Sequence, residues 1–180
     1  MRAIWKKNKV ISIKLDADLY SLAQMANDVA CMQFFDIFNE KDEWDVDLNI
    51  VTDLFLVNVG NVVIQRLGVR SIPESEAVSK KCNYNHLFIK PHMNPEGVSQ
   101  RGEFMWRGGD LIDVGENLEI SSYYAPIVIK DLTVYQHRDL ILKHEFTNMY
   151  GDKNVLNRLL KFKKEGINEE PMKKKVFPDL

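Results

Sequence analysis

The sequence predicts an α+β fold, in which an antiparallel β-sheet occupies the N-terminal half and the centre of the chain and C-terminal helices pack on it. Apolar residues alternate with polar ones at period two in several segments of the first seventy residues, and turn-prone Asn, Asp and Gly residues separate these segments. Helical spacing of apolar residues becomes clear only after residue 138. We therefore expect a meander that could curl into a barrel, followed by helices.

A single domain over residues 1–180 is the natural interpretation of a chain of this length. No internal repeat or low-complexity linker marks a boundary within it. The basic N-terminal residues do not lead into the apolar run of a signal peptide, and no window approaches the ~20 apolar residues of a membrane span. We therefore expect a cytoplasmic protein.

The first half of the chain predicts five strands. Residues 10–15 and 19–25 form the first two, with a short helix as the competing prediction for the second. Phe34 and Phe35 are adjacent in the third, at residues 31–38, so both faces of that strand should be covered, as in a central strand. Residues 51–59 and the β-branched run at 62–67 complete the set.

The second half of the chain moves from strands to helices. Residues 84–90 have a strand pattern, and residues 92–102 carry Pro, Asn and Gly close together, which predicts an irregular loop. Residues 108–115 and 119–124 should form a last strand pair. Helices are predicted at 138–150 and 152–166, since Gly151 and Gly166 stand where each would end.

Residues 40–47, here called the acidic segment, are too polar for the core and predict a surface loop. Their acids are Glu40, Asp42, Glu43, Asp45 and Asp47, against the single base Lys41. The whole chain has a formal net charge of only -2, so any electrostatic recognition must be local. Trp44 is the only large apolar residue in the segment.

Motifs of catalysis are mostly missing: the sequence has no phosphate-binding Gly-rich loop, nucleophile elbow or paired Cys-x-x-Cys. His86 and His92 could bind a divalent metal together with Asp110 or Glu96, which would suit a metal-dependent hydrolase. Their spacing matches no metal motif with a physical basis, so we favour structural roles and expect no catalytic residue, no metal and no cofactor.

Basic residues gather near both ends of the chain, at residues 2–9 and at Lys173, Lys174 and Lys175. A nucleic-acid-binding module would need this charge on one face, together with aromatic residues that stack on bases. We favour solvated tails and expect no nucleic-acid partner.

The chain resembles the bacterial immunity protein 26 family in the apolar spacing of four segments, at residues 9–15, 19–25, 34–37 and 53–57. The third of these segments contains the Phe35-Asp36 pair that also carries the resemblance. The resemblance implies a cytoplasmic α+β antidote of polymorphic toxin and contact-dependent inhibition systems. Such a protein is not an enzyme but binds and neutralises one cognate toxin domain, which we expect to be of the nuclease type. We also expect a monomer that does not bind membranes.

Under this interpretation the acidic segment contacts the toxin. The carboxylates of Glu40, Asp42, Glu43, Asp45 and Asp47 would attract a cationic cleft, and Trp44 would anchor the complex by becoming buried on contact. We expect Trp44 to make few core contacts in the free protein, so that its removal leaves stability unchanged.

Overall fold

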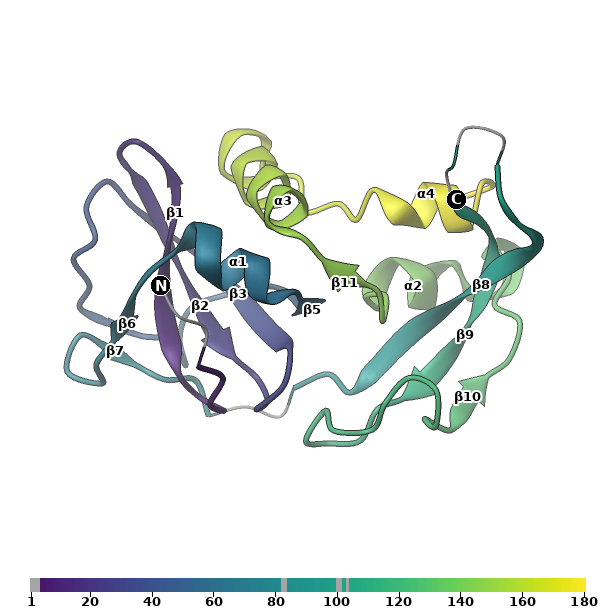
Figure 1. Cartoon of the computed structure of the whole chain (residues 1–180), viewed down its shortest axis with the longest axis horizontal. Coiled ribbons are helices and arrows are strands. Elements are labelled where there is room, and N and C mark those ends of the chain that lie inside the picture. Colours follow the sequence, from purple (N-terminus) through teal and green to yellow (C-terminus); the bar gives the residue numbers. More distant parts are fainter. Residues whose placement is uncertain (1–3, 82–83, 100–101, 103) are drawn as a thin grey trace. The chain divides into compact units, whose positions relative to one another are not determined.

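The chain folds into two compact units, each with its own β-sheet (Figure 1). Unit 1 contains Met1–Asn85 and Met149–Glu169, and unit 2 contains His86–Asn148 and Glu170–Leu180. The structure, a computed structural model, describes residues 4–81, 84–99, 102 and 104–180. Its mixture of a mainly antiparallel sheet with helices confirms the predicted α+β class, whereas one domain over residues 1–180 stays a prediction.

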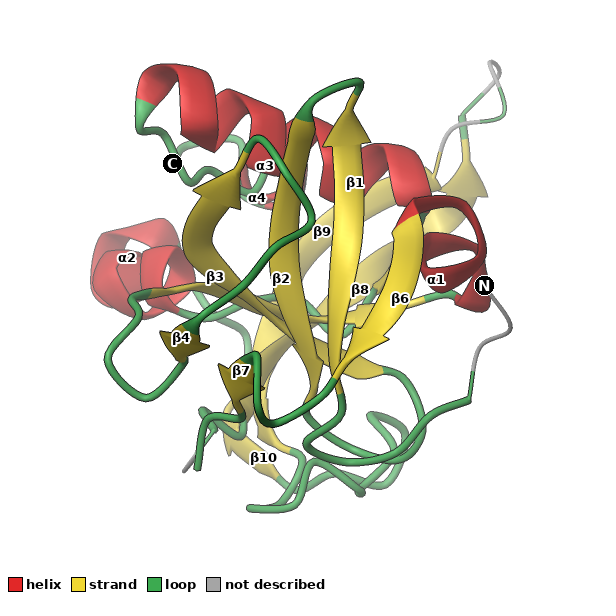
Figure 2. Cartoon of the chain, turned by 90° about the vertical axis from the view of Figure 1, so that its left-hand side faces the viewer, coloured by secondary structure: helices red, strands yellow, loops and turns green. Residues whose placement is uncertain are grey.

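A six-stranded sheet with the order β11-β5-β3-β2-β1-β6 is the frame of unit 1. Figure 2 shows its strands β3, β2, β1 and β6 side by side. Its neighbouring strands are antiparallel except for β11, which runs parallel to β5. The sheet is open, with β11 and β6 at its edges, and does not curl into a barrel. The strands are β1 (Val10–Asp16), β2 (Leu19–Met25), β3 (Cys31–Asn39), β5 (Asp53–Val59), β6 (Gly68–Ile72) and β11 (Met149–Tyr150).

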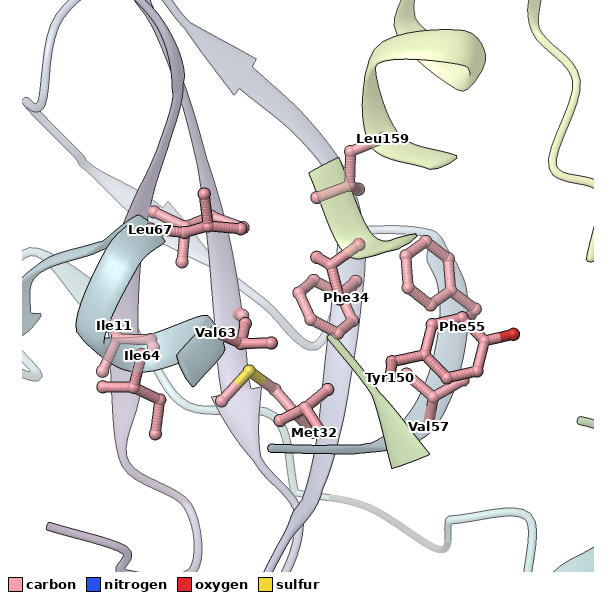
Figure 3. Close-up of a cluster of buried hydrophobic side chains, with 14 of the residues drawn as sticks. Ile11, Met32, Phe34, Phe55, Val57, Val63, Ile64, Leu67, Tyr150 and Leu159 are labelled. Carbon is pink, nitrogen blue, oxygen red and sulfur yellow. The ribbon is translucent and has the colours of Figure 1, made fainter. Parts of the chain in front are cut away.

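Two helices cover one face of this sheet, α1 (Asn61–Leu67) and α3 (Asp152–Glu165). Val63 of α1 and Leu159 of α3 are fully buried in the same cluster as Phe34 of β3, as Figure 3 shows. Phe34 also stacks on Phe55 of β5, with 4.7 Å between the ring centroids. The predicted packing of the second C-terminal helix on the sheet is therefore confirmed.

The opposite face of the sheet is covered by irregular chain rather than by helix. Phe35 points to this face and packs with Trp44 and Leu48. A short parallel ladder between β4 (Val46–Asp47) and β7 (Ala77–Val78) fixes the covering segments to each other. Because Phe34 and Phe35 are buried on opposite faces, β3 is the central strand that their adjacency predicts.

The prediction of a strand at residues 62–67 is wrong, because α1 occupies this run. Its β-branched residues favour a strand in isolation, but Val63, Ile64 and Leu67 are spaced so that a helix buries all three against the sheet. Burial therefore outweighs the local preference of the side chains.

Unit 2 is built on a long hairpin of β8 (Leu87–Val98) and β9 (Phe104–Asp113), to which β10 (Ile127–Ile129) adds a third strand. The helices α2 (Val134–Lys143) and α4 (Met172–Val176) belong to the same unit. Its core contains Ile89, Leu111 and Ile141, together with Phe146 and Phe177. Among the described helices of both units, none is long and apolar enough to cross a membrane.

Several predicted element boundaries in unit 2 are corrected by the structure. The predicted loop at 92–102 largely belongs to β8, which tolerates Pro91 because β8 is an edge strand with register shifts on both sides of Met93. Residues 119–124 form no strand and end in a turn at 122–124, and β10 pairs with β9 instead. The helix expected at 138–150 begins at Val134, after the Thr133 cap, and ends at Lys143.

Candidate functional site

The acidic segment follows the central strand β3, includes the short strand β4 and lies over the second face of the unit 1 sheet. It is attached at both ends by hydrogen bonds. Asn39 Nδ2 donates to the Glu43 carbonyl at 2.7 Å, and the Glu40 amide donates to Asn39 Oδ1 at 2.9 Å. At the far end the Val46 amide donates to the Glu76 carbonyl at 3.1 Å, next to the β4–β7 ladder.

Trp44 is buried, with 8% of its surface exposed, and this corrects the expectation of an exposed anchor. Its ring belongs to the cluster of Phe35 and Leu48. Its Nε1 donates to Asp42 Oδ1 at 2.7 Å, so the one polar atom of the side chain is satisfied. Trp44 therefore already contributes its apolar surface to the core of unit 1, and it is not available to bury against a partner.

Arg70 of the edge strand β6 connects the acidic segment to the turn before β7. Its Nε donates to Asp42 Oδ2 and its Nη2 to the Asp42 carbonyl, both at 2.9 Å. The same guanidinium donates to both carboxylate oxygens of Glu76, at 2.9 and 2.6 Å. These bidentate contacts are of the strong, geometrically specific kind. Asp42 is thus a structural residue of unit 1 and not a free surface charge.

The charges of this network are mutually stabilised. Hydrogen bonds to Glu76 and then to Asp42 raise the pKa of Arg70, against the opposing effect of partial burial. The hydrogen bond from Arg70 in turn lowers the pKa of Glu76. Arg70 and Glu76 were not singled out in the sequence, because no local pattern pairs Arg70 with an acid twenty-eight residues earlier.

Four carboxylates of the acidic segment remain exposed: Glu40, Glu43, Asp45 and Asp47. Asp47 Oδ1 accepts hydrogen bonds from the Asn49 amide at 2.9 Å and from Asn49 Nδ2 at 2.6 Å. These bonds, the backbone one first, lower the pKa of Asp47. Across the described parts of the chain, Glu40, Glu43 and Asp45 take part in no ion pair. The segment therefore presents uncompensated negative charge on a backbone that is held in place.

His86 and His92 lie in unit 2 and pair with different aspartates of the β8–β9 hairpin. His86 Nδ1 is 2.7 Å from Asp113 Oδ1, and His92 Nε2 is 2.9 Å from Asp110 Oδ2. The Gly115 amide and then His86 lower the pKa of Asp113. The hydrolase alternative requires the two histidines to converge on one site. They instead pair with different aspartates. The side chain of Glu96 is outside the described residues.

The basic cluster near the C-terminus is only partly a solvated tail. Lys173 is buried in α4, and its Nζ donates to the Leu142 carbonyl at 2.5 Å. Lys174 and Lys175 remain exposed. The N-terminal cluster belongs to unit 1, and its Arg2 lies outside the described residues.

The fold and this site define an α+β protein whose main sheet carries a fixed acidic segment on one face. The chain belongs to the family described as Domain of unknown function (DUF8309), whose model matches residues 1–180. No curated protein and no solved structure matches the chain.

Proposed function

We propose that this protein is a cytoplasmic immunity protein that binds and neutralises a cognate toxin domain through the acidic segment. The observation that carries this proposal is the combination of four exposed carboxylates with a segment backbone that is held by the core and by Arg70. The resemblance to the bacterial immunity protein 26 family supports the same class of function. In this proposal the protein acts by occlusion and needs no catalytic residue or cofactor.

The fixed backbone of the acidic segment favours binding because little conformational freedom is lost on contact. An unstructured acidic loop would lose backbone and side-chain entropy when it docks, and this loss would weaken the complex. Here Trp44 and Arg70 have already ordered the segment in the free protein. The role of Trp44 is thus to support the binding surface from beneath.

The charge of the segment indicates the chemistry of the partner. Exposed carboxylates without counter-ions attract a cationic surface, and a nuclease-type toxin has such a surface where it holds the phosphate backbone of its substrate. Glu40, Glu43, Asp45 and Asp47 would occupy that cleft and exclude nucleic acid from it. Asp42 contributes indirectly, since its carboxylate is already bound to Arg70 and Trp44.

The test is a binding measurement against the toxin domain encoded by the neighbouring reading frame. In the test variant the four exposed acids are replaced together (Glu40→Gln, Glu43→Gln, Asp45→Asn, Asp47→Asn). We expect association to slow by about tenfold or more at low ionic strength and to lose most of its salt dependence, because charge steers the encounter. Dissociation should change less.

The matched control removes the same charge elsewhere. Asp18, Glu116, Asp139 and Glu165 are exposed acids outside the acidic segment, and the control variant replaces them with Asn or Gln. It should keep the wild-type association rate and should still protect cells that express the toxin. Equal slowing in both variants would show that only net charge matters, and wild-type kinetics in the test variant would place the toxin on another surface.

A further inference from the structure

Unit 2 contains a cluster of three potential metal ligands, whereas the acidic segment belongs to unit 1. His92 belongs to β8, Asp110 to β9, and Asp131 to the turn that follows β10. One ligand atom from each residue lies within 4.8 Å of the others. Residues this far apart in the sequence meet only because the hairpin and the turn bring them together.

The two aspartates approach His92 at different ring nitrogens, so the residues are close to one another without sharing one ligand position. Asp110 Oδ2 is 2.9 Å from His92 Nε2, and Asp131 Oδ1 is 3.9 Å from His92 Nδ1. The Asp131 amide donates to Asp110 Oδ1 at 2.8 Å, which fixes the orientation of the Asp110 carboxylate. Asp131 adopts a left-handed conformation, with φ 51°, which is uncommon for a residue with a side chain. This conformation turns both its amide and its carboxylate toward the cluster.

The cluster brings two carboxylates together, and the protein offsets part of their charge, since Asp110 accepts from the Asp131 amide and contacts His92. Asp110 is almost completely buried, with 6% of its surface exposed, and a second carboxylate lies close to it. Among the described residues, the lysine paired with the cluster is Lys130, whose Nζ is 4.0 Å from Asp131 Oδ2 and which is largely exposed, so its contribution is weak. A bound divalent cation would compensate both carboxylates at once.

We propose that His92, Asp110 and Asp131 bind one divalent transition-metal cation. One imidazole with two carboxylates is a ligand set suited to Zn²⁺ or Mn²⁺, whereas Mg²⁺ and Ca²⁺ prefer oxygen ligands alone. Tetrahedral Zn²⁺ places its ligand atoms about 3.3 Å apart, so His92 Nε2 needs only a few tenths of an ångström more from Asp110. The carboxylate of Asp131, now closer to Nδ1, must turn toward Nε2, and its side chain is 69% exposed and free of packing that would prevent this. Three protein ligands leave the fourth position of the cation open to water.

The same hairpin provides an internal control, because His86 and Asp113 form a second His–Asp pair. Asp113 Oδ1 accepts from the Gly115 amide at 2.8 Å, in addition to its contact with His86. Among the described residues, no third acid or histidine completes this pair as Asp131 completes the other. The two pairs therefore differ in the third potential ligand, which only the His92–Asp110 pair has among the described residues.

The test is calorimetric titration of the full chain with Zn²⁺, after treatment with a chelator and without an affinity tag that contains histidine. We expect one equivalent to bind with a Kd in the micromolar range or below. Asp131→Asn and His92→Gln should weaken binding at least tenfold, and Asp131→Asn should fold normally because the side chain is exposed and Asn tolerates the left-handed conformation. His86→Gln should bind like the wild type.

A second set of measurements tests whether a cysteine thiolate binds the Zn²⁺. The titrations are repeated in a Cys82→Ser background, where the order of affinities should be unchanged. Replacement of Zn²⁺ by Co²⁺ should produce the visible absorption of a tetrahedral nitrogen and oxygen site in the wild type and not in His92→Gln. The proposal is overturned if the wild type binds no Zn²⁺, if Asp131→Asn binds as tightly as the wild type, or if His86→Gln loses as much affinity as His92→Gln.

Discussion

Trp44 connects the core of unit 1 to the acidic segment, so its replacement should affect stability first. Trp44→Ala removes a buried ring from the cluster of Phe35 and Leu48 and leaves a cavity. We expect a loss of about 3–5 kcal/mol in the free energy of unfolding. Equilibrium unfolding in urea measures this loss.

Trp44→Phe is the control for this prediction. It keeps most of the apolar ring and loses the hydrogen bond from Nε1 to Asp42, so we expect a smaller loss, of about 1 kcal/mol. If Trp44→Ala unfolds at the same urea concentration as the wild type, the ring does not contribute to the core and the exposed anchor predicted from the sequence regains support.

Glu170 makes stability depend on pH, because it is a buried carboxyl that carries a raised pKa. It precedes α4 in unit 2, and its Oε1 accepts from the Met172 amide at 2.8 Å. Burial raises the pKa of Glu170 from 4.5 to about 7. Between these values the folded chain holds a proton that the unfolded chain has lost. The free energy of unfolding should therefore fall as pH rises through this window, by on the order of 3 kcal/mol at most.

Glu170→Gln tests whether Glu170 causes this fall in the free energy of unfolding. Glutamine keeps an oxygen that can accept from the Met172 amide, and it does not titrate. Urea unfolding at several values between pH 4.5 and pH 8 gives the difference in stability between the variant and the wild type. The variant should gain relative stability as pH rises and then reach a plateau above pH 7. A difference that is constant with pH would show that Glu170 is not protonated in the folded chain.

At the scale of elements, α3 is the part of unit 1 whose packing is most easily tested. Val155 and Leu159 are fully buried against the sheet, and the helix ends at Gly166 in a left-handed conformation. Leu159→Asp places a charge without a partner in this core, and we expect a loss of several kcal/mol, measured as a fall in the temperature of unfolding. Asn157→Asp, on the exposed side of the same helix, should change stability by less than about 0.5 kcal/mol.

The elements that the sequence predicted correctly are those whose pattern reflects burial on one or two faces. The period-two segments became β1, β2 and β3, and the apolar face ending at Gly166 became α3. The strand expected at 62–67 is a helix, and Lys173 of the tail expected at 173–175 is buried, for one common reason. In both, burial against a distant part of the chain decides the structure, and no local pattern contains that information.

The candidate site was predictable in its charge and not in its architecture. The run of acids at residues 40–47 is visible in the sequence, and four of the five carboxylates are exposed as expected. That Asp42 instead pairs with Arg70 depends on the position of β6 in the sheet. The burial of Trp44 depends likewise on the uncovered face of β3, which no spacing within the acidic segment indicates.

At the scale of the whole molecule, the chain passes between the two units three times, near residues 85, 148 and 169. A chain that ends at Asn148 therefore lacks β11 and α3 of unit 1, as well as α4 of unit 2. We expect it to lose cooperative unfolding and near-ultraviolet circular dichroism, because the apolar surface of the sheet beneath Leu159 is left uncovered.

Residues 149–180, supplied as a separate polypeptide, are the complement to this truncation. Mixing the two fragments should restore the near-ultraviolet signal, since the missing contacts are packing contacts and not covalent ones. If the truncated chain alone already unfolds cooperatively, the first strands of unit 1 suffice without α3, and the interleaving of the chain has no energetic consequence.

The return of residues 149–169 to unit 1 sets the time at which this unit can be completed during synthesis. The strands β1, β2, β3 and β5 and the helix α1 emerge from the ribosome early, but α3, the second helix on this face, is made only after the whole of residues 86–148. At about 5–20 residues per second, the ribosome needs roughly 4–17 s to extend the chain from residue 86 to residue 169. During these seconds the part of the apolar face that α3 covers is exposed on the nascent sheet, and a chaperone that recognises such surfaces would find its substrate before the chain is released.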